Sequence, residues 1–114
     1  MNFLDELERF KEFRVKYLST LLSPLPTDSA RVHEERLLIE PWRFQALEFA
    51  AEFGAFESAL AVREYEKPDS RNWEFCQAQA HEQRKWRKKA EAAAEALESR
   101  SIKLSQHIKL TEGR

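Results

Sequence analysis

The sequence predicts an all-α protein, a small bundle of three main helices in which the C-terminal helix is overlong. Helix breakers are scarce, with two glycines and four prolines among 114 residues, and most of the remaining residues favour helices. Hydrophobic residues make up 42% of the chain and recur at helical spacings of three and four. Because 114 residues is the size of one ordinary domain, we expect a single helical domain over residues 1–114.

The first helix is predicted over about residues 2–22. Asn2 can cap it, and Asp5 and Glu6 place negative charge where the helix dipole favours it. Its apolar stripe has a vacancy at Arg14, whose head either reaches water or pairs with an acidic group on a neighbouring helix. Two prolines within residues 23–28 end the helix. The stripe comprises Phe3, Leu7, Phe10, Tyr17 and Leu21.

Residues 29–40 fit neither the helical nor the strand period cleanly, so a short helix and an extended stretch both remain open. Glu40 precedes a proline, which disfavours α geometry, and we expect a break or kink there. The second main helix is therefore predicted from Pro41 to about Lys67, with proline at its first position. Its apolar stripe is the clearest in the chain: Trp42, Ala46, Phe49, Phe53, Phe56 and Leu60.

Small residues form a second row on this helix, four residues apart: Ala46, Ala50, Gly54 and Ser58. Gly54 costs about 1 kcal/mol of helix propensity relative to alanine. A close approach of another helix would explain why a glycine stands there.

The third helix is predicted over about residues 70–110, with no proline or glycine before Gly113. At about 1.5 Å per residue it would span roughly 60 Å, more than its neighbours. Its end either overhangs, is covered by residues 29–40, or pairs with a second copy. A terminal strand over residues 101–110 is a minority alternative, because apolar residues alternate there.

An overhanging end would leave Leu97, Leu104 and Ile108 in water as a contiguous apolar seam. We expect two copies to pair along this seam in a coiled-coil-like contact, because a two-fold contact closes on itself. The short turn near residue 68 also makes the second and third helices antiparallel neighbours. The register expected from this turn places Glu52 near Lys85 and Glu48 near Lys89.

The densest basic run is the best candidate for a binding site, and we expect its tryptophan to be partly exposed. Three interpretations remain open: a solvated face whose charges pair with the acidic second helix, a nucleic-acid site, or a site for an acidic protein surface. The candidate binding residues are His81, Arg84, Lys85, Trp86, Arg87, Lys88 and Lys89.

No motif in the sequence carries chemistry. Neither His33 nor His81 forms an HExxH motif, no Cys or His pair has metal-ligand spacing, and no glycine-rich phosphate loop occurs. Cys76 falls on the apolar stripe of the third helix and is expected to be a small buried hydrophobe. We therefore expect no enzymatic activity, no metal and no cofactor.

The net charge of −1 is distributed unevenly, with ten basic and seven acidic residues in 69–114. We expect no secretory signal, no membrane span and a cytoplasmic location, since a single cysteine fits a reducing compartment. The chain is similar in appearance to small helical accessory proteins of bacteria and their phages, without a motif specific to any of them. We predict a non-enzymatic, homo-oligomeric interaction protein that binds another protein; the alternative is a nucleic-acid-binding accessory factor.

Overall fold

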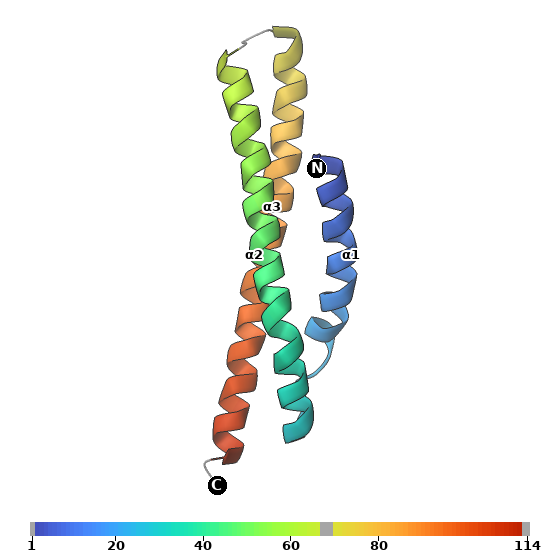
Figure 1. Cartoon of the computed structure of the whole chain (residues 1–114), viewed down its shortest axis with the longest axis vertical. Helices are drawn as coiled ribbons and strands as arrows, with labels where there is room; N and C mark the ends of the chain where they lie inside the picture. The colour runs from blue at the N-terminus through green and yellow to red at the C-terminus, as the bar shows by residue number, and fades with distance from the viewer. Residues whose placement is uncertain (1, 67–69, 113–114) are drawn as a thin grey trace.

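A computed structural model describes the backbone of residues 2–66 and 70–112 and the side chains of residues 2–60 and 77–109. These residues form three α-helices and no strand: α1 (Phe3–Leu22), α2 (Ser29–Glu66) and α3 (Ser70–Glu112). In Figure 1 the helices run alternately down, up and down, and α3 is the longest with 43 residues. The all-α bundle with an overlong third helix is therefore confirmed, and residues 101–110 are helical rather than a strand. The turn expected at residues 67–69 and the side chains of Trp73 and Cys76 lie outside the described residues.

The first helix has the predicted ends. The side chain of Asn2 accepts a hydrogen bond from the Asp5 amide at 2.9 Å, which satisfies one of the free donors of the first turn. Ser23 adopts an extended conformation after the last residue, and its amide donates to the Thr20 carbonyl at 3.2 Å. Residues 23–28 then connect α1 to α2, as the two prolines predict.

Helix α2 is continuous through Pro41, so the expected break at Glu40 and the predicted start at Pro41 are wrong. Packing offsets the lost backbone hydrogen bond, because Val32 and Ile39 are fully buried on the N-terminal side of the proline. Pro41 is exposed, as is Leu37, whose carbonyl loses its helical donor. That carbonyl can bind water on the solvent side of the helix, which limits the cost of the proline.

The first turns of α2 cover the end of α3. Leu97 and Leu104 are at most 1% exposed and Ile108 is 8% exposed, and all three belong to the core that includes Val32 and Ile39. Figure 1 shows this half of α2 beside the C-terminal half of α3. Coverage by residues 29–40 is thus the alternative that the structure adopts. The exposed seam from which self-association was inferred does not exist, because these side chains are buried within their own chain.

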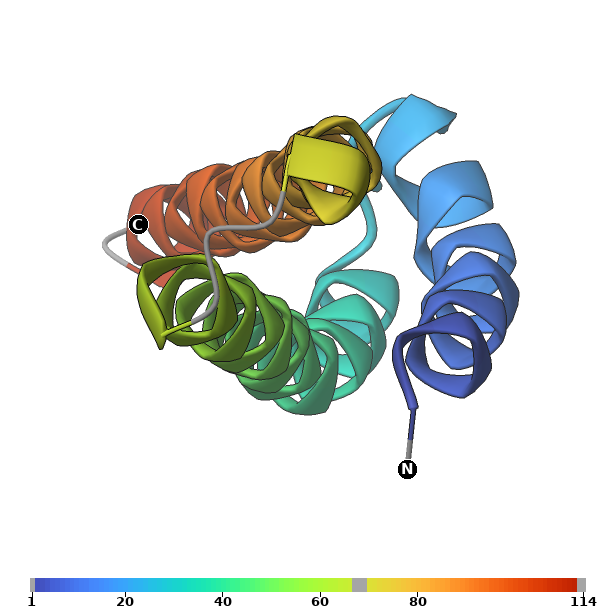
Figure 2. The same cartoon turned by 90° about the horizontal axis from the view of Figure 1, so that it is seen from above.

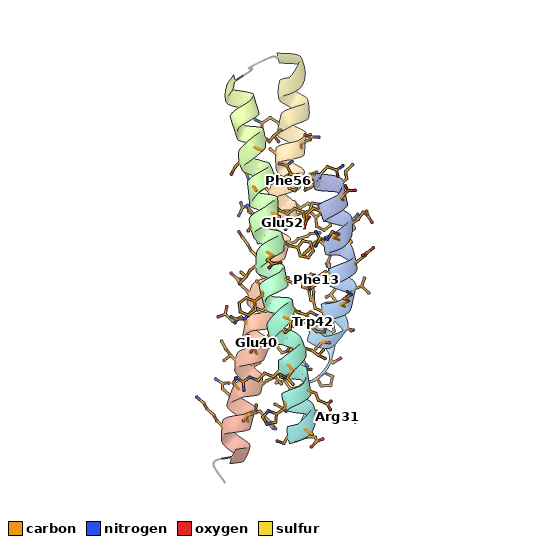
Figure 3. All side chains as sticks on the ribbon, viewed as in Figure 1. Phe13, Arg31, Glu40, Trp42, Glu52 and Phe56 are labelled. Carbon is orange, nitrogen blue, oxygen red and sulfur yellow. The ribbon has the colours of Figure 1, made fainter. Side chains whose placement is uncertain are left out.

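The three helices meet at a group of aromatic rings. The Phe10 ring centroid lies 5.3 Å from that of Phe49, 5.7 Å from that of Phe53 and 6.0 Å from that of Trp86, so all three helices contribute. These pairs are close to edge-to-face, the arrangement that aromatic quadrupoles favour. Phe49 and Phe53 are buried, as predicted, whereas Phe56 is only partly buried, between α1 and α2 (Figure 3).

The register of α2 against α3 differs from the expected one. Gly54 faces Arg87, and Glu40 accepts a hydrogen bond from Ser101 at 3.2 Å, which displaces the pairing by about one turn. The aromatic contacts of Phe53 and Trp86 with Phe10 fix this register, and these tertiary contacts could not be read from turn length. Gly54 also does not mark a close helix crossing. A Cβ placed there would meet only the Arg87 Cδ, at an ordinary contact distance of 3.6 Å.

The molecule is an elongated rod of 67 × 22 × 20 Å. Helices α2 and α3 lie side by side along its length, and α1 lies against one side of this pair (Figure 2). No described helix covers the opposite side of the pair. Among the described residues, none of the helices has a window that is apolar enough to cross a bilayer.

Candidate functional surfaces

The basic run of α3 is divided among several surroundings. Arg84 and Arg87 both pair with Glu57 of α2, Arg84 at 3.6 Å, and Arg87 also pairs with Glu91 at 2.8 Å. The hydrogen bond to Glu57 is the largest cause of the raised pKa of Arg87. These two arginines therefore hold α3 against α2. For them the interpretation as ion pairs with the acidic second helix is confirmed, although the partner is Glu57 rather than Glu48 or Glu52.

Trp86 is a core residue, and the expectation of an exposed tryptophan is wrong. It is 9% exposed, its ring packs on Phe10, and its indole nitrogen donates to Glu82 at 3.3 Å. Cationic sequence neighbours led to the expectation of an exposed ring, but Lys85 and Lys89 lie over the ring and cover it. A ring held in this way has no free face on which a base could stack.

Three lysines from α1 and α3 lie around the Trp86 ring: Lys11, Lys85 and Lys89. We call these lysines, together with Arg14, the basic cluster. The ammonium groups of Lys89, Lys11 and Lys85 lie 4.4, 5.7 and 5.8 Å from the ring centroid. Burial lowers the pKa of Lys89, with smaller contributions from Lys85 and Arg14. The contribution of α1 could not be predicted from the sequence, since no sequence pattern places Lys11 beside Trp86.

Three residues that the sequence singles out as possible binding or ion-pair residues form no ion pair among the described side chains. His81 and Lys88 are exposed and have no ion pair among the described side chains. Arg14 is half-buried and, within the same residues, lies near Lys89 rather than in an ion pair with a carboxylate. The predicted seven-residue site is therefore not one surface: Lys85 and Lys89 gather around Trp86, whereas Arg84 and Arg87 meet on Glu57.

A row of exposed apolar residues lies on α2, on the side opposite its buried stripe. Leu37 is 76% exposed, Phe44 57% and Leu47 49%, and Ala51 and Ala55 are also exposed. Spacings of three, four and seven place these residues along one side of the helix. We call these five residues the outer face of α2. This face was not predicted, because the stronger stripe of Phe49 and Phe53 already accounts for the apolar pattern of the helix.

An acidic edge on α3 adjoins this face. Glu91, Glu95 and Glu98 are exposed and line an open depression together with Leu47 and Ala94. A second depression shares Glu95 and Glu98 and continues to Ile102, which is 52% exposed. We call the three glutamates the acidic edge. Their spacing of four and three is visible in the sequence, but their position beside apolar residues of α2 is not.

Arg100 ties the three helices together from a buried position. It is 7% exposed and makes a two-pronged ion pair with Glu35 of α2, at 3.0 and 2.8 Å. The same guanidinium donates to the carbonyls of Ser23 at 2.7 Å and Pro24 at 3.2 Å, at the end of α1. Its role is structural. An arginine within an otherwise apolar stripe was the one signal for it in the sequence.

Two carboxyl groups meet between α1 and α2. Glu6 is 2% exposed, its Oε2 accepts from Arg9 at 3.3 Å, and its buried Oε1 accepts from no described donor. Burial, together with a hydrogen bond to Glu52 and repulsion from its charge, raises the pKa of Glu6 to about 7. A protonated Glu6 can donate to Glu52, which accounts for the unpartnered oxygen.

The geometry defines an all-α three-helix protein whose described residues include no group of three or more side chains arranged to hold a metal. Comparison of the chain with protein-family models, curated proteins and solved structures found no match.

Proposed function

We propose that the chain is a non-enzymatic interaction protein that binds another protein through the outer face of α2. The observation that carries this proposal is the exposure of Leu37, Phe44 and Leu47 on one side of a helix whose other side already fills the core. Contiguous apolar patches are uncommon on isolated domains and mark sites of association. Large apolar residues such as Phe44 supply most of the area that interface centres bury.

The arrangement of α1 supports the same surface. Because α1 lies against one side of the α2–α3 pair, the opposite side of both helices is open to a partner (Figure 2). The outer face does not stabilise the bundle, so its apolar residues need another explanation. A reducing cytoplasm, which suits the single Cys76, is the proposed location.

Photo-cross-linking in cells that produce the protein tests the proposal. A photoreactive amino acid in place of Phe44 should give a discrete adduct with one other protein, because it would lie inside the interface. The control is the same substitution at Val15, an apolar residue of α1 that is 74% exposed and lies off the outer face. Equal adducts from both positions, or none from position 44, would contradict the proposal.

The basic cluster favours a second candidate, a nucleic-acid-binding accessory factor. Lys11, Arg14, Lys85 and Lys89 concentrate positive charge across α1 and α3. Phosphate contacts would make the affinity for a nucleic acid fall steeply with salt, whereas a packed protein interface responds weakly. This candidate would be favoured if single- or double-stranded oligonucleotides bind at low salt, and if the double variant Lys85→Gln/Lys89→Gln loses that binding.

A further inference from the structure

We propose that the outer face of α2 and the acidic edge of α3 together bind a basic amphipathic helix of the partner protein. This inference rests on the proposed function and names the chemistry of the partner. The juxtaposition that carries it is an apolar ridge on one helix beside a row of carboxylates on the next, with Leu47 and Ala94 between them. Helices with one apolar side and cationic flanks bind to such grooves.

The apolar part of the surface has the length and spacing that a helix requires. Leu37, Phe44 and Ala51 follow one another at intervals of seven residues, two turns apart, on the outer side of α2. From Leu37 to Ala55 the ridge extends about 27 Å, the length of a helix of about 18 residues. Ile102 continues the apolar surface onto α3, where it lines the second depression beside Glu98.

Most carboxylates of the surface are not neutralised by described residues of the chain, although Glu91 of the acidic edge pairs with Arg87. Glu48, Glu95 and Glu98 are exposed and form no ion pair among the described residues. The arginines that border the groove are already engaged, since Arg43 pairs with Glu40 at 3.2 Å and Arg87 pairs with Glu57 and Glu91. Lys103 also lines the second depression, so the carboxylates outnumber the cations there.

Charge complementarity selects a basic partner over a second copy. A two-fold contact between copies places the same patch on both sides of the interface. The acidic edges of two copies would then approach each other, and like charges at an interface oppose association. A helix that carries lysines or arginines on its flanks would instead meet Glu95 and Glu98 from the opposite side.

A designed peptide tests the chemistry of the partner. The probe is a fluorescent helical peptide of about 18 residues, with leucines three and four apart and lysines on both flanks. Two control peptides keep its length: one carries glutamates in place of the lysines, and the other has the same composition in a scrambled order. Binding to the full chain is followed by fluorescence anisotropy at two salt concentrations.

The basic amphipathic peptide should bind, more weakly at high salt, and both control peptides should bind at least about tenfold more weakly. Phe44→Ser and the pair Glu95→Lys/Glu98→Lys should each weaken binding by about tenfold or more. The matched controls on α1, Val15→Ser and Glu12→Lys, should leave it unchanged, and circular dichroism verifies that every variant is folded. Equal binding of the glutamate peptide, or no binding of the basic peptide, would overturn the inference.

Sedimentation equilibrium of the chain alone tests whether a second copy of the chain, rather than a partner helix, binds to the outer face. A monomer at micromolar concentration agrees with the proposal, whereas a dimer that Phe44→Ser dissociates would assign the outer face to a second copy and overturn it. If position 44 gives a specific cross-link in cells while the peptide fails, the interaction function stands and only the basic character of the partner is wrong.

Discussion

Glu6 shows how a single buried side chain makes the stability of the whole chain depend on pH. Its pKa of about 7 in the folded protein lies above the ordinary value of 4.5, because burial and Glu52 disfavour the charged form. Below pH 4.5 the carboxyl is protonated in both the folded and the unfolded chain, and its burial carries no charge penalty. As the pH rises to about 7, the unfolded chain ionises first, so the contribution of Glu6 to stability falls and then levels off.

Glu6→Gln should therefore stabilise the protein at high pH and have little effect at low pH. The gain at pH 8 relative to pH 4.5 should be on the order of 3 kcal/mol, because an amide cannot acquire the buried charge. Denaturant unfolding of both proteins at the two pH values measures this difference, with Glu12→Gln on the exposed side of α1 as the control. A gain that is independent of pH would show that the pKa of Glu6 is the same in the folded and the unfolded chain, so that burial does not raise it.

Gly54 gives a second test at the scale of one residue. Because a Cβ there would meet only the flexible Arg87 side chain at 3.6 Å, Gly54→Ala should add about 0.5–1 kcal/mol to the free energy of unfolding. The gain comes from helix propensity. A loss of stability in thermal or denaturant unfolding would instead restore the close helix crossing that the row of small residues suggested.

Periodicity predicted individual core residues well where one stripe dominates and poorly where the surroundings come from another helix. Phe49 and Phe53 are buried as expected, since spacings of three and four specify one side of a helix. Trp86 was misjudged because its sequence neighbours are cations. Their ammonium groups lie over the ring, that of Lys89 at 4.4 Å from the ring centroid, so the cations cover the tryptophan. The environment of Glu6 was missed because Glu52 approaches it only in the folded chain.

At the scale of the helices, Arg100 connects all three elements. The last turn of α1 contains no basic residue of its own, and the guanidinium from α3 supplies positive charge to the carbonyls of Ser23 and Pro24. Its fork-like pair with Glu35 fixes the first half of α2 against α3. One side chain thus joins the end of α1, the first half of α2 and α3.

Arg100→Met should lower the free energy of unfolding by about 3–5 kcal/mol, because Glu35 would keep a largely buried charge without a partner. Arg100→Lys should restore little of this, since one ammonium cannot reproduce the two-pronged geometry. Denaturant unfolding measures both variants against Lys103→Met, an exposed position one turn away. Nearly unchanged stability of Arg100→Met would mean that the ion pair has no structural role.

The sequence allowed both ends of α1 to be predicted, because capping residues and prolines act locally. The prediction of a break before Pro41 is wrong, because it followed only the local rule for the residue before a proline. Burial of Val32 and Ile39 outweighs that rule in the folded chain. The continuity of α2 in turn decides what covers the end of α3.

For the whole molecule, composition and spacing were sufficient to predict the all-α class and the long third helix. The register of α2 against α3 and the uncovered side of the pair depend on aromatic contacts among three helices, which one-dimensional patterns do not specify. For this reason the sequence predicts the basic run as the binding site, whereas the outer face of α2 is visible only in the structure.

We propose that a partner binds this outer face rather than the basic cluster. The most direct measurement follows the backbone amide signals of the isotopically labelled chain by NMR while the basic amphipathic peptide is added. We expect the shifted amides to lie along residues 37–55 of α2 and residues 91–102 of α3. Shifts centred instead on Lys11, Lys85 and Lys89 would contradict it.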